Sequence, residues 1–118
     1  MTSGVFMTEL AVADMVASLR FYHAALGLPV VLQDAPNGFA LLGTTHGKLA
    51  LKQRAEPTPG DILLHFEVAG LAAALTALHA LGIAPVGELK TSHEGYTRAI
   101  LRDPDGHTVV LFEWHPAS

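Results

Sequence analysis

Two ionisable residues of different chemistry, Glu9 and His65, hold equivalent positions 56 residues apart in the chain. A carboxylate and an imidazole can hydrogen-bond a ligand, exchange protons with it or, with one more ligand, hold a metal ion. We expect hydrogen bonding to a ligand, because two ligands do not make a metal site and the charge of Lys52 would repel a cation. Two alternatives stay open. The two residues could hold a metal ion together with a third ligand, or they could be a partly exposed pair without a function.

Other residue types that often carry chemistry form no known pattern. The chain has no cysteine, which excludes disulfides, thiolate metal sites and cysteine nucleophiles. A Gly-rich phosphate loop, a nucleophile elbow and a His-Glu-x-x-His motif are also missing from the sequence. His93, beside Glu94 and Tyr96, lies in a loop that could cover a pocket, whereas His23 and His79 are expected at helix surfaces.

The sequence contains an internal repeat, which explains why Glu9 and His65 correspond. The same offset relates three further pairs, namely Val12 and Val68, Leu19 and Leu75, and His23 and His79. The offset then shifts by one residue, and the segment LGLPV at 26–30 matches LGIAPV at 81–86. An offset held across this length, followed by the same turn residues, indicates a duplicated supersecondary unit.

Each copy reads as a strand, a helix and three short strands. Asp14 is a good N-cap for the first helix, predicted from Met15 to Leu26, and Gly27 and Gly82 are expected to end the two helices. The second helix is predicted from a stripe that begins at Leu71 and ends at Leu81. Short strands are predicted at 30–33, 39–42 and 49–52, and again at 86–89, 96–101 and 108–114. The fold class is therefore α+β, with one domain over 1–118 made of βαβββ modules at 5–53 and 61–115.

Alternation along the strands assigns a face to each residue. Nine apolar residues share the parity that must pack under the helices: Leu10, Val12, Leu49, Leu51, Leu64, Phe66, Val68, Val109 and Leu111. The opposite parity mixes charged, imidazole and aromatic groups, which suits the lining of a partly wet pocket. A solvated sheet face is the alternative, but Phe112 and Trp114 would then stand in water. We expect six residues to bind a ligand: Glu9, Phe39, Lys52, His65, Tyr96 and Phe112.

Composition limits the partners. The net charge is −4 and the seven Lys and Arg residues are scattered singly, so no nucleic-acid-binding surface is expected. No apolar run approaches the roughly 20 residues that cross a bilayer, so no membrane partner is expected. The first residues lack a charged segment followed by an apolar one, so we expect no secretion signal and a cytoplasmic location.

The motifs resemble those of the vicinal oxygen chelate superfamily, which includes glyoxalases, bleomycin resistance proteins and extradiol dioxygenases. In the first copy the matching residues are Val12, Asp14, Ser18, Phe21, Tyr22, Leu26, Gly27 and Leu28. In the second they are Gly95, the turn from Asp103 to His107, and the segment from Leu111 to Glu113. The resemblance covers nearly the whole chain and implies two βαβββ modules that form a curved mixed sheet around a cleft.

The resemblance also implies where a metal would be held. Enzymes of this superfamily place His, Gln or Glu on four strands, and those positions fall here on Met7, Ala50, Leu63 and Val110. None of these side chains ligates a divalent cation well. We therefore expect neither a metal nor another cofactor.

The expected function is that of a metal-free protein that sequesters an aromatic or cationic organic compound, as bleomycin resistance members do. An acidic chain with aromatic groups on a concave face suits a cationic ring compound. Glu94 departs from the pattern, because Trp often precedes the loop glycine in such proteins. The alternative is a glyoxalase-like lyase or isomerase, or a dioxygenase-like enzyme, with a non-standard site that uses Glu9 or His65 as acid or base. An interaction domain is a third possibility, and a homodimer is expected.

Overall fold

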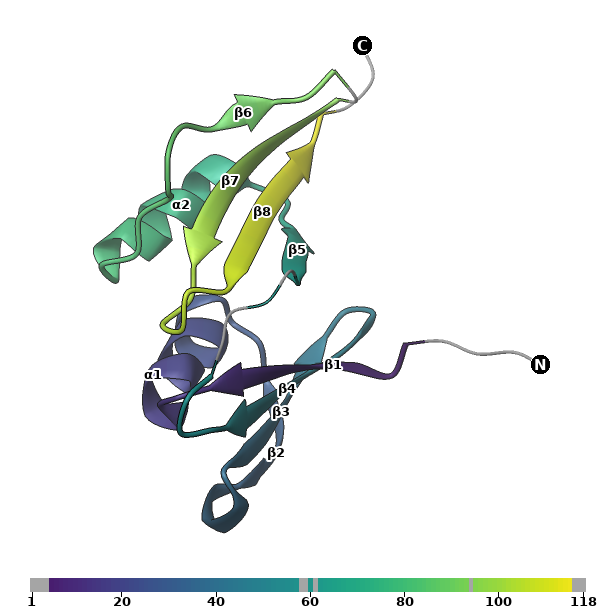
Figure 1. Cartoon of the computed structure of the whole chain (residues 1–118). Coiled ribbons are helices and arrows are strands. Elements are labelled where there is room, and N and C mark those ends of the chain that lie inside the picture. Colours follow the sequence, from purple (N-terminus) through teal and green to yellow (C-terminus); the bar gives the residue numbers. More distant parts are fainter. Residues whose placement is uncertain (1–4, 58–59, 61, 94, 116–118) are drawn as a thin grey trace, which may run out of the picture. The chain divides into compact units, whose positions relative to one another are not determined.

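The computed structural model describes residues 5–57, 60, 62–93 and 95–115. The chain divides into two compact units, Met1–Pro59 and Gly60–Ser118, which are described separately here (Figure 1). No helix among the described residues is long and apolar enough to span a membrane.

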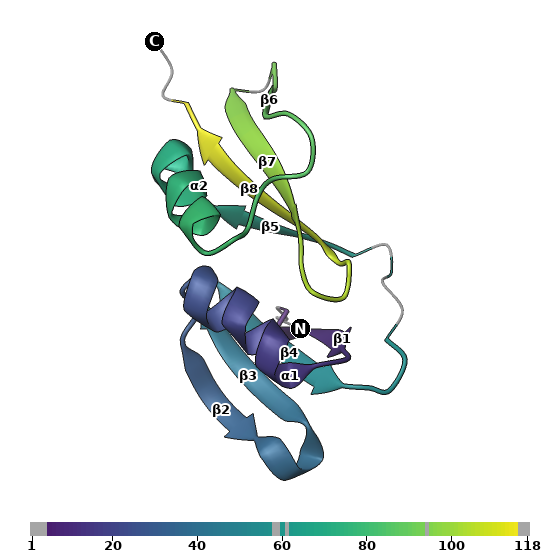
Figure 2. The ribbon, with the colours of Figure 1, turned by 90° about the vertical axis from the view of Figure 1, so that its left-hand side faces the viewer.

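The first unit is one four-stranded sheet with helical segments on one face. Its elements are β1 (Met7–Val12), α1 (Met15–Leu19), the π-helix η1 (Arg20–Ala25), β2 (Val30–Asp34), the 3₁₀-helix η2 (Ala35–Asn37), β3 (Phe39–Thr44) and β4 (Gly47–Gln53). The strand order is β1-β4-β3-β2, with β1 parallel to β4 and the other pairs antiparallel. Figure 2 shows α1 lying across this sheet.

The second unit repeats the same topology. It consists of β5 (Leu63–Glu67), α2 (Leu71–Ala80), β6 (Lys90–Thr91), β7 (Tyr96–Arg102) and β8 (Thr108–Trp114). Its strand order is β5-β8-β7-β6, and β5 runs parallel to β8. The predicted α+β class with two similar βαβββ modules is therefore confirmed.

The helix boundaries follow from their terminal residues. Asp14 accepts a hydrogen bond from the backbone N–H of Ala17 at 3.2 Å, which confirms it as the N-cap of α1. Gly27 and Gly82 have φ of 79° and 82°, the left-handed conformation that ends a helix at low cost for glycine. The predicted single helix up to Leu26 is wrong in detail, because the hydrogen bonding changes at Arg20 and the segment continues as a π-helix.

The predicted strand at 86–89 is also wrong. The strand at this edge is Lys90–Thr91, and Val86 contributes only a single hydrogen bond from its N–H to the carbonyl of Ile100, at 2.7 Å. Gly87 lies between them with φ of 74°, a left-handed conformation that turns the chain out of the extended path. Val86 and Leu89 are consequently exposed.

The cores lie between the helices and the sheets, as the alternation predicts. Leu10, Val12, Leu49, Leu51, Val109 and Leu111 are buried, and Leu64, Phe66 and Val68 are half-buried. From the helices, Phe21 and Tyr22 are buried with ring centroids 4.9 Å apart, and Leu71 and Leu78 are buried. Leu81 departs from its predicted core position, because α2 ends at Ala80 and the Leu81 side chain is exposed.

Candidate functional site

Four rings form a continuous cluster on the second sheet, on the face opposite to α2. His65, Tyr96, Phe112 and Trp114 come from β5, β7 and β8, and we call them the aromatic face. Ring centroids are 6.4 Å apart for His65 and Phe112, 6.0 Å for Tyr96 and Phe112, 5.3 Å for Tyr96 and Trp114, and 5.7 Å for Phe112 and Trp114. Each pair meets edge to face, which is a favourable arrangement for aromatic rings.

The rings are not buried in the core. Trp114 is 50% exposed, His65 is exposed, and Tyr96 and Phe112 are half-buried. Adjacent rings therefore present their faces and edges at the surface of the second unit. An aromatic surface of this kind is suited to stacking against a ring-containing compound.

The sequence predicted three of the four rings as ligand residues and did not include Trp114. Strand alternation placed Trp114 on this face, but only the structure shows that its ring contacts those of Tyr96 and Phe112. Arg98 was missed as well. It follows Tyr96 by two residues and pairs directly with Phe112 across β7 and β8, so alternation along β7 was the signal that could have found it.

The first sheet carries the other three predicted residues on its face opposite to α1. Phe39 and Lys52 are register partners on β3 and β4, and Glu9 on β1 pairs with the neighbouring Ala50. The Lys52 ammonium donates to the carbonyl of Asn37 at 3.1 Å, which holds it at the η2 turn. Each unit thus brings its own three predicted residues to one face of its sheet.

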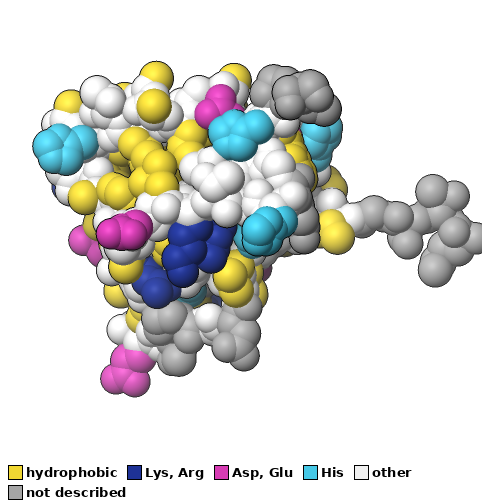
Figure 3. Space-filling view, turned by 90° about the horizontal axis from the view of Figure 1, so that it is seen from above, with side chains coloured by type: hydrophobic (Ala, Val, Ile, Leu, Met, Phe, Trp, Pro, Cys, Tyr) yellow, Lys and Arg dark blue, Asp and Glu magenta, His cyan; other side chains and the backbone are white. Residues whose placement is uncertain are grey.

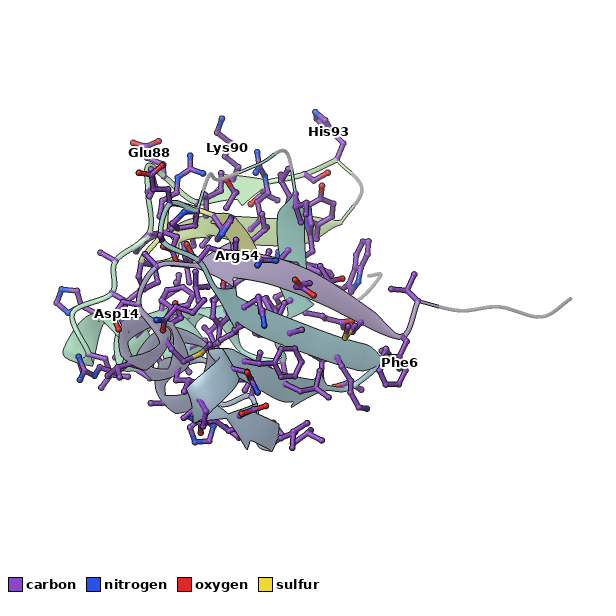
Figure 4. All side chains as sticks on the ribbon, turned by 60° about the horizontal axis from the view of Figure 1, so that its bottom comes forward. Phe6, Asp14, Arg54, Glu88, Lys90 and His93 are labelled. Atoms are coloured by element: carbon purple, nitrogen blue, oxygen red, sulfur yellow. The ribbon has the colours of Figure 1, made fainter. Side chains whose placement is uncertain are left out.

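Glu9 has an ionic partner that the sequence did not indicate. The guanidinium of Arg54 lies 3.8 Å from a carboxylate oxygen of Glu9, and both side chains are about half exposed, at 56% and 45%. Figure 4 shows Arg54 beside β1. A pair as exposed as this one contributes little to stability, so Glu9 can exchange Arg54 for a ligand at small cost.

The four positions at which the resemblance to the superfamily implies metal ligands are apolar in both units. Ala50 and Val110 are buried, at 0% and 1% exposure, while Met7 and Leu63 are exposed. By register Glu9 lies beside Ala50, and His65 lies beside Val110. The two ionisable residues are therefore equivalently placed in their modules, each next to an apolar side chain where a metal ligand would be needed.

A group of potential ligands does occur in the turn before β8. One ligand atom each of Asp103, Asp105 and His107 lies within 4.8 Å of the others. One Asp103 carboxylate oxygen, however, accepts hydrogen bonds from the backbone N–H groups of Asp105, at 3.0 Å, and His107, at 2.7 Å. These bonds close the turn, which gives the motif a structural role.

Several other histidines lie at the surface. His23, His79, His93 and His115 are exposed, and Figure 3 shows histidine side chains standing at the surface of the molecule. The Nδ1 atom of His23 hydrogen-bonds the carbonyl of Leu28 at 2.7 Å, which ties the end of η1 to the following turn. Glu94, predicted beside His93 in a covering loop, lies outside the described residues.

The last strand of each module also supports the start of the helix. The side-chain oxygen of Gln53 on β4 accepts a hydrogen bond from the N–H of Met15 at 3.3 Å. A carboxylate oxygen of Glu113 on β8 does the same for the N–H of Leu71, also at 3.3 Å. The N-cap of α2 is Gly70, which has no side chain to do this, so Glu113 satisfies an N–H that the helix leaves unpaired.

We expect Glu113→Ala to destabilise the protein by about 1 kcal/mol, the usual cost of losing a side-chain cap. Glu113→Gln keeps an acceptor oxygen and should lose only the smaller interaction of a negative charge with the helix N-terminus. Urea unfolding monitored by circular dichroism measures both. Equal losses for the two variants would contradict a role in hydrogen bonding to Leu71.

Comparison with known proteins places the chain among its relatives. A family model for the glyoxalase-like domain matches residues 7–112. An integron cassette protein from the mobile metagenome of a Halifax Harbour sewage outfall is similar in structure, with a TM-score of 0.80 and 21% identity over 95% of this chain and 99% of that one. A sequence search of curated proteins finds no match.

Two further solved structures share the fold. For a glyoxalase/bleomycin resistance protein/dioxygenase from Nocardioides the TM-score is 0.77, with 19% identity over 100% of this chain and 87% of that one. For lactoylglutathione lyase from Agrobacterium tumefaciens it is 0.78, with 24% identity over 96% and 95% of the two chains. Because the family model spans nearly the whole chain, this protein belongs to the glyoxalase-like domain family of the vicinal oxygen chelate superfamily.

Proposed function

We propose that the protein binds a small ring-containing organic compound without a metal, and that the aromatic face of the second unit is where the ring stacks. The observation that carries the proposal is the contact of Tyr96, Phe112 and Trp114 with one another while each stays partly open to solvent. Rings that served only stability would be expected in the core under α2, where the other apolar residues of this unit pack.

The other predicted residues offer polar groups for ligand recognition, each on the sheet of its own unit. His65 borders Phe112, so its imidazole can hydrogen-bond a substituent on a ring stacked there. In the first unit, Glu9 and Lys52 offer an exchangeable carboxylate and ammonium beside Phe39. We propose that Glu9, Phe39 and Lys52 bind ligand on the face of the first sheet, as His65, Tyr96 and Phe112 do on the face of the second.

A ligand screen tests the proposal directly. Compounds that bind only the folded protein raise its melting temperature, so a thermal-shift screen of fused-ring compounds against aliphatic compounds of similar size is suitable. We expect shifts from ring compounds only, and shifts that Phe112→Ala reduces. Equal responses to both groups, or shifts that Phe112→Ala leaves unchanged, would contradict binding at the aromatic face.

We predict that the protein purified without chelator carries well under one equivalent of transition metal per chain. Met7, Ala50, Leu63 and Val110 offer no ligand that holds such an ion. Elemental analysis by mass spectrometry measures the content, and a chelator should leave the melting temperature unchanged. Stoichiometric, tightly held zinc, nickel, manganese or iron would contradict the prediction.

The alternative of a lyase or isomerase rests on one observation, the position of the exposed His65 imidazole beside the rings. There it could exchange a proton with a bound compound. The lactoylglutathione lyase among the similar structures gives the reaction to assay first. Turnover that His65→Gln abolishes, in metal-free protein, would replace the binding function by this one.

We also propose a twofold homodimer and place its contact at β2. This strand is an edge of the first sheet, and its Val30, Val31 and Leu32 are 36%, 54% and 55% exposed. An edge strand with exposed apolar side chains and no lysine or proline of its own is open to pairing with another strand. A second copy meets this requirement through the same surface, as a twofold contact demands.

We expect light scattering at micromolar concentration to give twice the chain mass of 12.5 kDa. Leu32→Lys should convert the dimer to monomer, because the added charge cannot be buried in an apolar contact. Leu89→Lys is the matched control, since Leu89 is 46% exposed in the second unit. A monomeric wild-type protein would contradict the dimer, and an effect of Leu89→Lys alone would contradict its placement at β2.

A further inference from the structure

Two cationic side chains flank the rings on one side. Across the second sheet, one row of register partners runs from Glu67 on β5 through Phe112 on β8 and Arg98 on β7 to Lys90 on β6. Residues directly opposite one another in a sheet point to the same face, with side chains close enough to interact. Arg98 therefore lies next to Phe112 on the aromatic face, and Lys90 lies beyond it.

These two cations differ from four of the chain's other five basic residues; the fifth, Arg20, is exposed and lies on η1 of the first unit. Most basic side chains are engaged: Lys48 lies over the ring of Phe6, Lys52 donates to Asn37, Arg54 pairs with Glu9, and Arg102 donates to Thr108. Among the residues that the structure describes, no carboxylate forms an ion pair with Arg98 or Lys90. Arg98 is half-buried beside the rings, and Lys90 stands clear of the ribbon in Figure 4.

We propose that Arg98 and Lys90 bind an anionic group of the ligand, so that the compound is an aromatic carboxylate or a similar aryl anion. This inference rests on the proposed function and specifies its ligand. A guanidinium binds a carboxylate through two parallel hydrogen bonds, and the planar group beside Phe112 suits an anion attached to a stacked ring. Lys90 at the exposed edge adds a second positive charge.

The charge balance of the row favours an anion over the cation expected from the overall acidity. Glu67 is the only carboxylate of the row, and Phe112 separates it from the two cations. Short-range charge near the ring outweighs the net charge of the whole chain, because exposed charges beyond about 10 Å are largely screened at moderate ionic strength. The side of Phe112 that faces Tyr96 and Arg98 is therefore anion-selective.

Three probes that share one ring system test the inference: naphthoate, naphthylmethanol and naphthylmethylamine, which are anionic, neutral and cationic at neutral pH. Isothermal titration calorimetry with the whole chain should give the tightest binding for naphthoate. Arg98→Gln should weaken naphthoate by roughly tenfold or more, the effect of losing a hydrogen bond to a charged group, and leave naphthylmethanol nearly unchanged. Lys90→Gln, at an exposed position, should act in the same direction with a smaller effect.

Arg102→Gln is the matched control, because it removes the same charge from the same strand and face. Arg102 donates to Thr108, away from the rings. It should leave the preference for naphthoate intact. The inference is overturned if naphthoate binds no tighter than naphthylmethanol, or if Arg102→Gln and Arg98→Gln weaken it equally. In either case the proposed function survives if Phe112→Ala weakens all three probes. If no probe binds, both the inference and the proposed function are overturned.

Discussion

Replacing Phe112 by Ala is expected to weaken ligand binding by about 1–3 kcal/mol, on the order of 5- to 150-fold in affinity. Phe112 has ring contacts with His65, Tyr96 and Trp114, so its removal takes away both a stacking surface and the side chain that keeps the cluster together. Because the ring is only half-buried, the fold should remain stable. Calorimetric titration of the ligand found by the thermal-shift screen measures the loss.

One variant serves as a control for this result, and a second variant tests the first sheet. Glu113→Gln changes the residue next in sequence, which faces the helix and accepts from Leu71, and should leave affinity unchanged. On the first sheet, Glu9→Gln should weaken the binding of a cationic compound more than that of a neutral one, because only the former loses a charge-assisted bond. If Glu113→Gln altered affinity while Phe112→Ala bound normally, the assignment of faces on β8 would be wrong.

The sequence predicted the fold well where short-range physical rules decide the structure. The repeat that relates Val12 to Val68 gave the duplicated topology, and Gly27 and Gly82 have the left-handed conformation expected of residues that end helices. The failures have local causes. Gly87, inside the strand predicted at 86–89, turns the chain before the observed strand at Lys90–Thr91. The pattern of apolar residues does not reveal such a turn.

The candidate site was predicted only in part, since alternation gives the face of a residue but not its contacts. It placed Tyr96 and Phe112 together, yet it could not show that Trp114 completes the ring cluster. Nor could it show that Arg54 reaches Glu9 while Arg98 is left without a carboxylate partner among the described residues. Whether a cation pairs with a carboxylate depends on side-chain distances across strands. Those distances follow from the strand register and the three-dimensional packing, which the sequence pattern does not give.

A second large effect is expected in the core. Tyr22→Ala should reduce the free energy of unfolding by about 3–5 kcal/mol, the range for deleting a large buried aromatic ring. Tyr22 is 0% exposed, and its ring packs edge to face against that of Phe21. Such a loss is a large fraction of the total stability of a domain of this size, so the urea midpoint should fall steeply.

Tyr96→Ala makes the same chemical change on the aromatic face and separates the two roles of tyrosine in this chain. Tyr96 is half-buried and contacts only the rings of Phe112 and Trp114 among the aromatic residues described, so its loss should cost much less stability than that of Tyr22. It should instead reduce affinity for ring compounds, whereas Tyr22→Ala, where still folded, should bind them nearly normally. If Tyr96→Ala proved as destabilising as Tyr22→Ala and left binding intact, the aromatic face would be a structural cluster and the ligand site would have to lie elsewhere.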